Sequence, residues 1–306
     1  MSLDFTGRVA IVTGAGGGLG RCHALALAAR GARVLVNDLG GTVSASSQGG
    51  GGSPAAAQAV VDEIVAAGGQ ALANGASVTD PAAVAAMVQQ AVDAWGRVDI
   101  LVNNAGILRD KSFAKMPLED FRAVIDVHLM GAVHCCQAVW PHMVAQKYGR
   151  IVMTTSSSGL FGNFGQANYG AAKMALVGLM QTLSIEGAKS DIRVNCLAPT
   201  AATRMTEGLL PPAVLAVLTP EAVVPAMLVL VGQDAPNRAI ACAGAGTFEA
   251  AHITLTKGLH LGLGDDTPER LAAAWPQVSD RQGEAVPLSG AAQGANEMGQ
   301  ALAARA

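Results

Sequence analysis

Ser156, Tyr169 and Lys173 are three side chains whose types and order suit proton transfer at the oxygen of an alcohol or a ketone. Tyr169 and Lys173 are four positions apart, so on a helix they lie on one face, one turn from each other. A free phenol has a pKa of about 10, and a nearby ammonium and a positively charged ring bound beside it would lower it. Tyr169 would then act as acid or base, while Ser156 donates to the substrate oxygen. Taken alone, a Tyr/Lys pair is more often a packed tyrosine beside a surface lysine.

A glycine-rich turn follows the first apolar run of the chain. Residues 8–13 are typical of a strand buried in a parallel sheet, and residues 19–30 are typical of a helix. Between a strand and a helix, glycines let the backbone approach a pyrophosphate, which the free N–H groups of the helix N-terminus then bind. The alternative is a tight turn that binds nothing. The residues expected at this cradle are Gly14, Gly16, Gly18, Leu19 and Gly20.

Asp38 ends the second apolar run, residues 32–37. It follows the glycine turn at about the 20-residue spacing at which a carboxylate binds the ribose hydroxyls of a dinucleotide. The same carboxylate would repel a 2′-phosphate, so the sequence predicts NAD rather than NADP as the cofactor. A solvated aspartate at a strand end is the alternative.

Strands and helices alternate along the rest of the chain. The alternation predicts an α/β fold, a doubly wound parallel sheet of the Rossmann type with helices on both faces. Ligands in such a sheet bind outside the carboxyl ends of the strands, where all of these motifs fall. The further strands are expected at 98–102, 149–155 and 192–197, and the helices at 55–67, 81–95, 118–146 and 168–188.

The composition predicts a well-filled core and an apolar surface that another subunit covers. Hydrophobic residues make up 51% of the 306 residues and charged residues 14%, against a usual charged share of about 25%. The stretch 169–188 is apolar on more than one face, so we expect it to pack on the sheet and on a second subunit of a homodimer or homotetramer. Residues 1–254 are expected to form one domain with both cofactor and substrate sites. Residues 255–306 would be an extension that wraps the partner subunit or stays partly disordered.

Charge and cysteine usage exclude several classes of partner. The net charge of −3 gives no reason to expect binding of nucleic acid or of an anionic membrane. The five cysteines have neither metal-ligand nor redox spacing, so no metal is expected. Unpaired thiols, the lack of a secretory signal pattern and the lack of a membrane span predict a cytoplasmic protein with a small-molecule substrate. Residues 40–54, rich in glycine and serine, read as a surface loop.

Taken together, the motifs resemble those of short-chain dehydrogenases/reductases over roughly residues 5–250. They are Thr-Gly-x-x-x-Gly-x-Gly at 13–20, Asn-Asn-Ala-Gly at 103–106, Ser156 and Tyr-x-x-x-Lys at 169–173. The resemblance implies an oxidoreductase in which further residues bind the cofactor beside Tyr169 and Lys173. These are Asn104, Ala105, Gly106 and Pro199.

Several segments are similar, more specifically, to the (3R)-hydroxyacyl-CoA dehydrogenase module of peroxisomal multifunctional enzymes. The segments are 36–41, 103–110, 147–150, 162–169, 204–206 and 267–269, with Trp275 beyond them. This resemblance implies NAD-dependent oxidation of a (3R)-3-hydroxyacyl-CoA to the 3-oxoacyl-CoA. A dehydrogenase for steroids or other secondary alcohols, and a non-catalytic dinucleotide sensor, remain alternatives.

His128 departs from the family pattern, which places an asparagine at this position to hold a water in the proton relay. A neutral imidazole can donate and accept hydrogen bonds, so His128 either serves the relay or is a packed histidine; both readings stay open. The hydratase and sterol-carrier regions are absent, and residues 304–306 do not match a peroxisomal address, which predicts a stand-alone cytoplasmic dehydrogenase.

The substrate-binding residues are the least defined part of the prediction. Residues 200–220 are expected to form a lid over the cofactor. Arg204 would meet a CoA phosphate or simply be solvated, and Phe161, Phe164 and Met205 would line an acyl channel or belong to the core.

Overall fold

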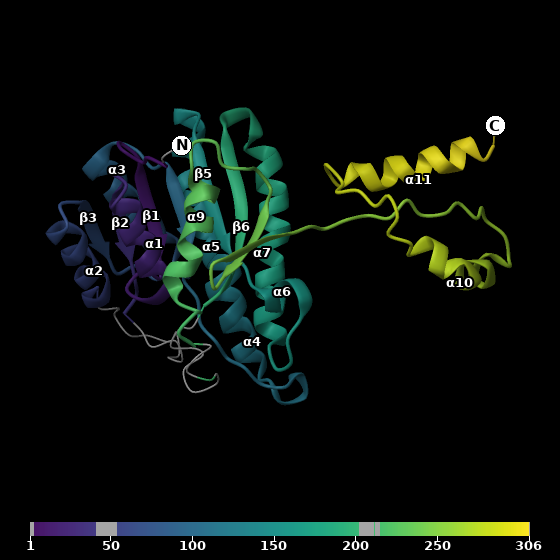
Figure 1. The fold of residues 1–306 in the computed structure, drawn as a ribbon, viewed down its shortest axis with the longest axis horizontal. Coiled ribbons are helices and arrows are strands. Elements are labelled where there is room, and N and C mark those ends of the chain that lie inside the picture. Colours follow the sequence, from purple (N-terminus) through teal and green to yellow (C-terminus); the bar gives the residue numbers. More distant parts are fainter. Residues whose placement is uncertain (1–2, 41–53, 202–210, 212–214, 306) are drawn as a thin grey trace. The chain divides into compact units, whose positions relative to one another are not determined.

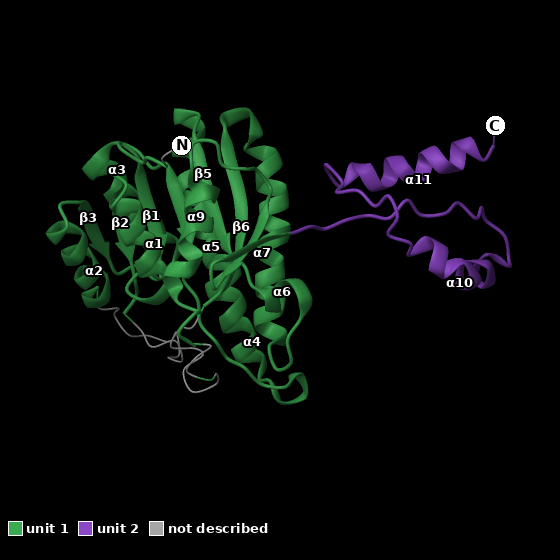
Figure 2. Cartoon of the chain, viewed as in Figure 1, with its two compact units in different colours: residues 1–250 green, residues 251–306 purple. Residues whose placement is uncertain are grey.

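The computed structural model describes residues 3–40, 54–201, 211 and 215–305. It divides into two compact units, residues 1–250 and residues 251–306 (Figure 2). The expected contacts of Arg204 and Met205, most of the expected lid and most of the loop 40–54 lie outside the described residues.

An eight-stranded sheet forms the centre of the first unit (Figure 1). The pairs from β3 through to β7 are all parallel. From one edge to the other the strands are β3 (Gln70–Asn74), β2 (Arg33–Asn37), β1 (Val9–Thr13), β4 (Ile100–Asn103), β5 (Gly149–Thr154), β6 (Ile192–Thr200), β7 (Ile240–Gly244) and β8 (Thr247–Ala251). The strand order reverses between β1 and β4, and the crevice at such a reversal is where dinucleotides bind.

Helices cover both faces of this sheet, as Figure 1 shows. The helices of the first unit are α1 (Gly18–Ala28), α2 (Ala55–Ala66), α3 (Pro81–Trp95), α4 (Leu118–Ile125), α5 (Gly131–Gln146), α6 (Ser157–Phe161), α7 (Ala167–Glu186) and α9 (Val224–Val231). Helix α1 contacts α2 and α9, while α3 contacts α5 and α4 contacts α7. All five residues of β1 and all six of β5 are buried, because each strand has neighbours in the sheet and helices above and below. The predicted doubly wound α/β fold is confirmed.

The expected helix 118–146 is a continuous run that contains a π-helical turn, Asp126–Met130, between α4 and α5. Among the described residues this run is the one helix that is long and apolar enough to cross a membrane by length and composition. In the structure, α5 packs against β4, β5 and α3, which are the contacts of a helix in a protein core.

The second unit contains α10 (Thr267–Val278) and α11 (Ala291–Ala303). Gln300 on α11 donates a hydrogen bond to the backbone carbonyl of Lys257, and Leu255 pairs with Ala285 in an antiparallel bridge. None of the described residues of this unit is buried. Its apolar side chains, such as Trp275 at 59% exposure, therefore lack a core of their own.

Candidate active site

The glycine turn lies between β1 and α1, at the carboxyl end of β1. Gly14 has a φ of 62°, a left-handed conformation that favours glycine, and a Cβ there would lie 2.7 Å from the Cα of Ala105. A Cβ at Gly16 would lie 2.8 Å from Oδ2 of Asp38. The turn therefore presents bare backbone at the start of a helix, and this arrangement fits a dinucleotide pyrophosphate. Gly18, Leu19 and Gly20 form the first turn of α1.

Asp38 directly follows β2 and is half-buried. Its Oδ2 accepts a hydrogen bond from the backbone N–H of Gly16 at 2.8 Å, and its Oδ1 accepts one from Gly40, also at 2.8 Å. The carboxylate therefore holds the glycine turn in place and lies beside the proposed cofactor cradle, so it is more than a solvated residue at a strand end.

Asn104 ties the end of β4 to the glycine turn. Its Nδ2 donates to the carbonyl oxygens of Thr13 and Gly14, both at 3.0 Å. The hydroxyl of Thr13 accepts hydrogen bonds in return from the backbone N–H groups of Asn104 and Ala105. Thr13 thus positions the segment 104–106, a role that its place in the motif did not indicate.

Pro199 belongs to β6, where it is half-buried and pairs with Ala243 of β7. Phe161 and Phe164 are 73% and 90% exposed, so neither is a core residue. That these two side chains line an acyl channel stays a prediction.

Ser156 and Tyr169 meet at the carboxyl end of β5. Ser156 caps the N-terminus of α6, where its Oγ accepts a hydrogen bond from the N–H of Ser158 at 3.1 Å, and it lies close enough to Tyr169 to lower the pKa of that phenol. Lys173 is buried one turn further along α7, with its Nζ 5.4 Å from the centre of the Tyr169 ring. The structure therefore brings together the three residues that the sequence singled out.

The pKa of Tyr169 moves in the direction opposite to the one expected from the sequence. Burial raises it above 10.0, the hydrogen bond from Ser156 opposes this rise, and the negative charge of Asp110 adds to it. Burial also lowers the pKa of Lys173 from 10.5 to about 7, so this lysine is partly neutral at neutral pH. The expectation counted the attraction of an ammonium and of a bound nicotinamide ring and left out the loss of hydration that both side chains suffer on burial; a lowered pKa beside bound nicotinamide stays a prediction.

His128 lies in the π-helical turn, buried between the end of β4 and Tyr169. Its Nε2 is 2.8 Å from the carbonyl oxygen of Ile107, and its ring meets that of Tyr169 edge-on with centres 5.2 Å apart. Nδ1 has no hydrogen-bond partner among the described residues. Burial and the nearby Lys173 hold the pKa of His128 well below 6.5, so the ring is neutral.

Asn168 is a positioning residue that the sequence motifs did not reveal. Its side chain is fully buried, its Nδ2 donates to the carbonyl oxygen of Arg109 at 3.0 Å, and its Oδ1 accepts from the N–H of Tyr169 at 2.7 Å. It therefore fixes the start of α7 against the segment that follows β4. Its place immediately before Tyr169 was the available signal.

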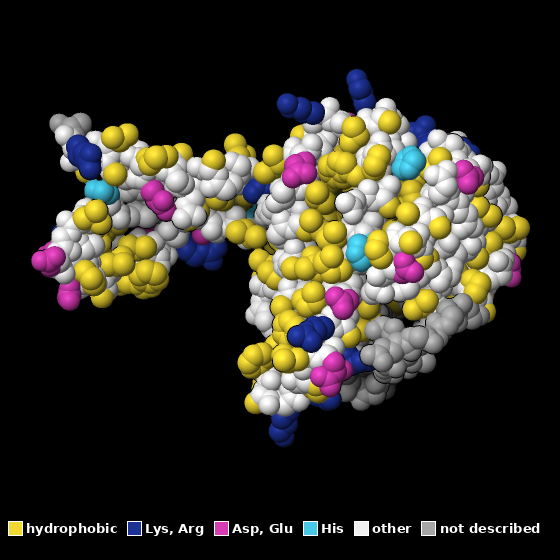
Figure 3. Space-filling model, turned by 180° about the vertical axis from the view of Figure 1, so that it is seen from behind, with side chains coloured by type: hydrophobic (Ala, Val, Ile, Leu, Met, Phe, Trp, Pro, Cys, Tyr) yellow, Lys and Arg dark blue, Asp and Glu magenta, His cyan; other side chains and the backbone are white. Residues whose placement is uncertain are grey.

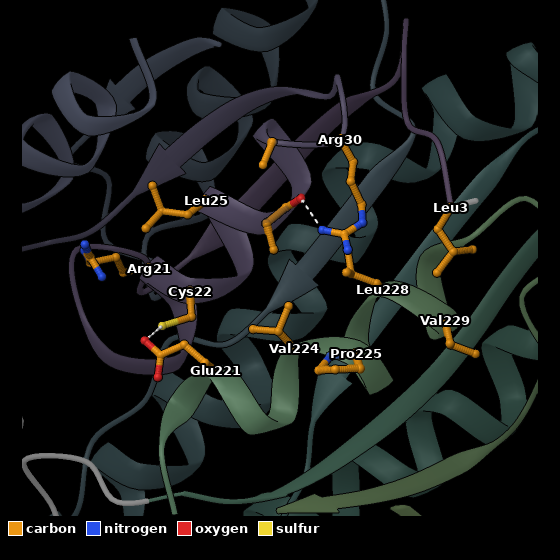
Figure 4. A pocket seen from close by; sticks show the side chains of 12 residues that line it. Leu3, Arg21, Cys22, Leu25, Arg30, Glu221, Val224, Pro225, Leu228 and Val229 are labelled. Atoms are coloured by element: carbon orange, nitrogen blue, oxygen red, sulfur yellow. Dashed lines mark hydrogen bonds between the residues drawn. The ribbon is translucent and has the colours of Figure 1, made fainter. Parts of the chain in front are cut away.

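A hollow of about 480 Å³ lies between α1 and α9 (Figure 4). Its lining is mostly apolar, with Leu25, Val224 and Leu228 among its residues. Inside it the Cys22 thiol bonds to Glu221 at 3.3 Å, and burial raises the pKa of that thiol to about 11. None of the residues proposed for catalysis lines this hollow.

The fold and the site define an oxidoreductase of the dinucleotide-binding α/β class. The model of the short chain dehydrogenase family matches residues 8–211, and the chain belongs to this family. It is an enzyme that acts on CH–OH groups of a small-molecule substrate with a nicotinamide dinucleotide. The predicted family and type of reaction are thus confirmed.

Individual relatives agree with this assignment. The peroxisomal hydratase-dehydrogenase-epimerase of Saccharomyces cerevisiae is 49% identical over 282 residues, which cover 91% of this chain and 31% of the relative. The chain thus spans about a third of that protein. The structure of the full-length peroxisomal multifunctional enzyme type 2 of Drosophila melanogaster matches with a TM-score of 0.79 and 38% identity over 98% of this chain and 50% of that one. A 7α-hydroxysteroid dehydrogenase in complex with NADH matches with a TM-score of 0.71 and 31% identity over 80% of this chain and 95% of that one.

The predicted cytoplasmic location is wrong. The relatives from Saccharomyces cerevisiae, Dictyostelium discoideum, Drosophila melanogaster, Mus musculus and Neurospora crassa are all named peroxisomal enzymes. These names point to the peroxisome. The cytoplasmic prediction rested on unpaired cysteines and on sequence patterns that do not distinguish the cytoplasm from the peroxisome.

Proposed function

We propose that this chain oxidises a (3R)-3-hydroxyacyl-CoA to the 3-oxoacyl-CoA with NAD as its cofactor. The observation that carries the proposal is the grouping of Ser156, Tyr169 and the buried Lys173 just after β5, at the strand ends that also hold the glycine turn. The Saccharomyces cerevisiae relative is named a hydratase-dehydrogenase-epimerase, and a dehydrogenase that follows a hydratase acts on a hydroxy compound. The likeness of segments 103–110 and 162–169 to the hydroxyacyl-CoA module adds to this support.

The residues of the chain divide the proton chemistry between them. NAD held at the glycine turn and Lys173 would supply the acceptor for the hydride of the carbon that carries the hydroxyl group. Tyr169 accepts the hydroxyl proton, and Ser156 donates a hydrogen bond to the same oxygen. Lys173 would bind the nicotinamide ribose, and its charge, when present, favours the phenolate of Tyr169.

The choice of NAD over NADP rests on Asp38. Its carboxylate accepts a hydrogen bond from the glycine turn. With the pyrophosphate at that turn, the carboxylate would bind the hydroxyl groups of the adenosine ribose. A 2′-phosphate at that ribose would bring a second negative charge against it, which costs free energy.

The active form is proposed to be a homodimer or a homotetramer. A hollow of about 340 Å³ lies between α5 and α7, and its apolar lining includes Val133, Trp140 and Leu179. Further hydrophobic side chains are scattered over the face of the molecule seen in Figure 3, and Met174 and Ile185 of α7 are 39% and 50% exposed. A second copy would cover this face, and residues 255–306, which bury none of their described side chains, would wrap that copy.

A substrate panel tests the proposal. NADH formation is followed with (3R)- and (3S)-3-hydroxyacyl-CoA, a hydroxysteroid and simple secondary alcohols. We expect the (3R)-acyl-CoA to be preferred; preference for the steroid or a simple alcohol would overturn the substrate assignment. Tyr169→Phe should lower kcat by about 10²- to 10⁴-fold and leave NADH binding intact. A wild-type protein that binds NADH but turns over no alcohol would instead support the dinucleotide sensor.

A further inference from the structure

Gln166 lies just before α7 and joins three segments through one side-chain amide. Its Nε2 donates a hydrogen bond to Oδ2 of Asp110 at 2.7 Å. Its Oε1 accepts one from the Oγ of Ser158 at 2.8 Å and one from Nδ2 of Asn163 at 3.0 Å. The segment after β4, helix α6 and the start of α7 are therefore tied together at this amide.

One backbone hydrogen bond and one hydrogen bond from a side-chain amide lie beside the Asp110–Gln166 contact. The N–H of Lys111 donates to the carbonyl oxygen of Gly165 at 2.9 Å, and Asn168 donates to the carbonyl oxygen of Arg109 at 3.0 Å. Residues 109–111 therefore lie along the connection between α6 and α7. Asp110 bonds to that connection through its side chain.

The contacts of Gln166 lead directly to both residues of the proton transfer. The Ser158 hydroxyl bonds to Gln166, and the Ser158 N–H bonds to the Oγ of Ser156. Tyr169 follows Gln166 by one helical turn on α7. A shift of Gln166 would therefore move Ser156 and Tyr169 relative to each other, and two hydroxyls that act on the same substrate oxygen need a defined separation.

We propose that Gln166, held by Asp110, is a positioning residue that sets the separation of the Ser156 and Tyr169 hydroxyls. The inference rests on the proposed function, because it takes these two hydroxyls to be the groups that act on the substrate. Neither Gln166 nor Asp110 touches the reacting atoms in this mechanism.

Asp110 also acts on Tyr169 through its charge. The titratable groups that face the phenol are Lys173 on α7, His128 on the π-helical turn and Asp110 after β4, while the Cys196 thiol on β6 faces Lys173. The carboxylate raises the pKa of Tyr169. Loss of its charge should therefore lower that pKa, a change that a purely structural role of Asp110 would not produce.

Four proteins test the proposal: the wild type, Gln166→Glu, Asp110→Asn and the double variant. Gln166→Glu keeps an acceptor for Ser158 but places two acceptor-only carboxylates against each other, so we expect kcat to fall by about 10- to 100-fold. Asp110→Asn keeps an acceptor for Gln166, so we expect a smaller loss of kcat than in Gln166→Glu, with a pH profile of kcat that follows the lowered pKa of Tyr169. In the double variant the new amide at position 110 donates to the new carboxylate at position 166, and we expect it to restore kcat.

Thermal unfolding and NADH binding are measured on all four proteins as controls. A Gln166→Glu variant with the kcat of the wild type, or a double variant that recovers nothing, overturns the proposal. If Gln166→Glu unfolds at a much lower temperature while its folded fraction keeps the kcat of the wild type, the contact serves stability and the proposal also fails. In a titration of tyrosinate absorbance, Asp110→Asn should shift the Tyr169 transition to lower pH; Tyr169→Phe identifies that transition, since Tyr148 is the only other tyrosine.

The comparison does not depend on the acyl-CoA assignment. The wild type is first assayed on the substrate panel, and the variants are then measured with whichever alcohol it oxidises. A wild type that prefers another alcohol refutes the substrate but leaves the positioning role testable. Equal kcat values across the four proteins refute the positioning role alone.

Discussion

The ammonium nitrogen of Lys173 lies 5.4 Å from the centre of the Tyr169 ring and donates its hydrogen bond to the carbonyl oxygen of Thr154, at 2.5 Å. The lysine therefore acts on the phenol through space. Because burial brings its pKa to about 7, its charge varies within the physiological pH range. The site thus contains a cation whose presence is itself a function of pH.

Replacement of this lysine should change the pH dependence of stability. Its pKa is about 7 in the folded protein against 10.5 ordinarily, so the unfolded chain binds the proton more tightly. Burying the charged lysine lowers the free energy of unfolding. This loss is complete below about pH 7 and disappears as the pH rises towards 10.5. Lys173→Met removes this cost, so its gain in unfolding free energy over the wild type should be largest below pH 7 and shrink above it. Urea unfolding of both proteins across this range measures the difference, and a difference independent of pH would contradict the prediction.

Asp38→Asn should weaken the preference for NAD over NADP. The amide oxygen can still accept the hydrogen bond from Gly16, so the turn is kept, while the charge that repels a 2′-phosphate is lost. We expect the ratio of kcat/KM for NADH to that for NADPH to fall by about tenfold or more, which corresponds to about 1.4 kcal/mol. Steady-state kinetics with both cofactors provide the measurement. An unchanged ratio would show that Asp38 only holds the turn.

The sequence predicted the central strands because β1, β2 and β5 are apolar runs that are buried on both faces. It missed β3, whose residues Gln-Ala-Leu-Ala-Asn have low strand propensity and lie at the edge of the sheet. It likewise missed β7, which is rich in alanine and glycine. The π-helical turn within 118–146 also escaped prediction, since a five-residue change of helical pitch leaves the apolar pattern nearly intact.

For the site, too, the sequence predicted the features that depend on neighbouring residues and missed those that depend on residues far apart in the chain. The spacing of Tyr169 and Lys173 on one helix is a local property, and Ser156 follows a strand that was itself predicted. The pKa direction of Tyr169 depends on burial by several elements, which spacing alone does not give. Gln166 and Asp110 are 56 residues apart in the chain, so no local pattern connects them.

His128→Ala separates a relay from a packed histidine. Nδ1 of His128 has no partner among the described residues, and the ring lines the same small cavity as Lys173 and Thr13. We therefore expect kcat to fall by about tenfold or more, with partial recovery in His128→Asn, whose amide can donate and accept. Unchanged turnover in His128→Ala, with a loss of thermal stability only, would show that the histidine packs against Tyr169 and does no more.

A charge on the outer face of α7 should break the proposed dimer. Ile185 is 50% exposed on α7, on the same helix as Leu179 and Leu183, which line the hollow beside α5. Ile185→Glu would place a carboxylate in the buried contact between two copies, where an unpaired charge costs several kcal/mol. Val65→Glu on α2 is the matched control, because Val65 is 55% exposed on a helix that contacts α1 and β3 rather than α5 or α7. Light scattering at micromolar concentration should give a monomer for the first variant and the mass of the wild type for the second; a monomeric wild type would exclude the proposed assembly.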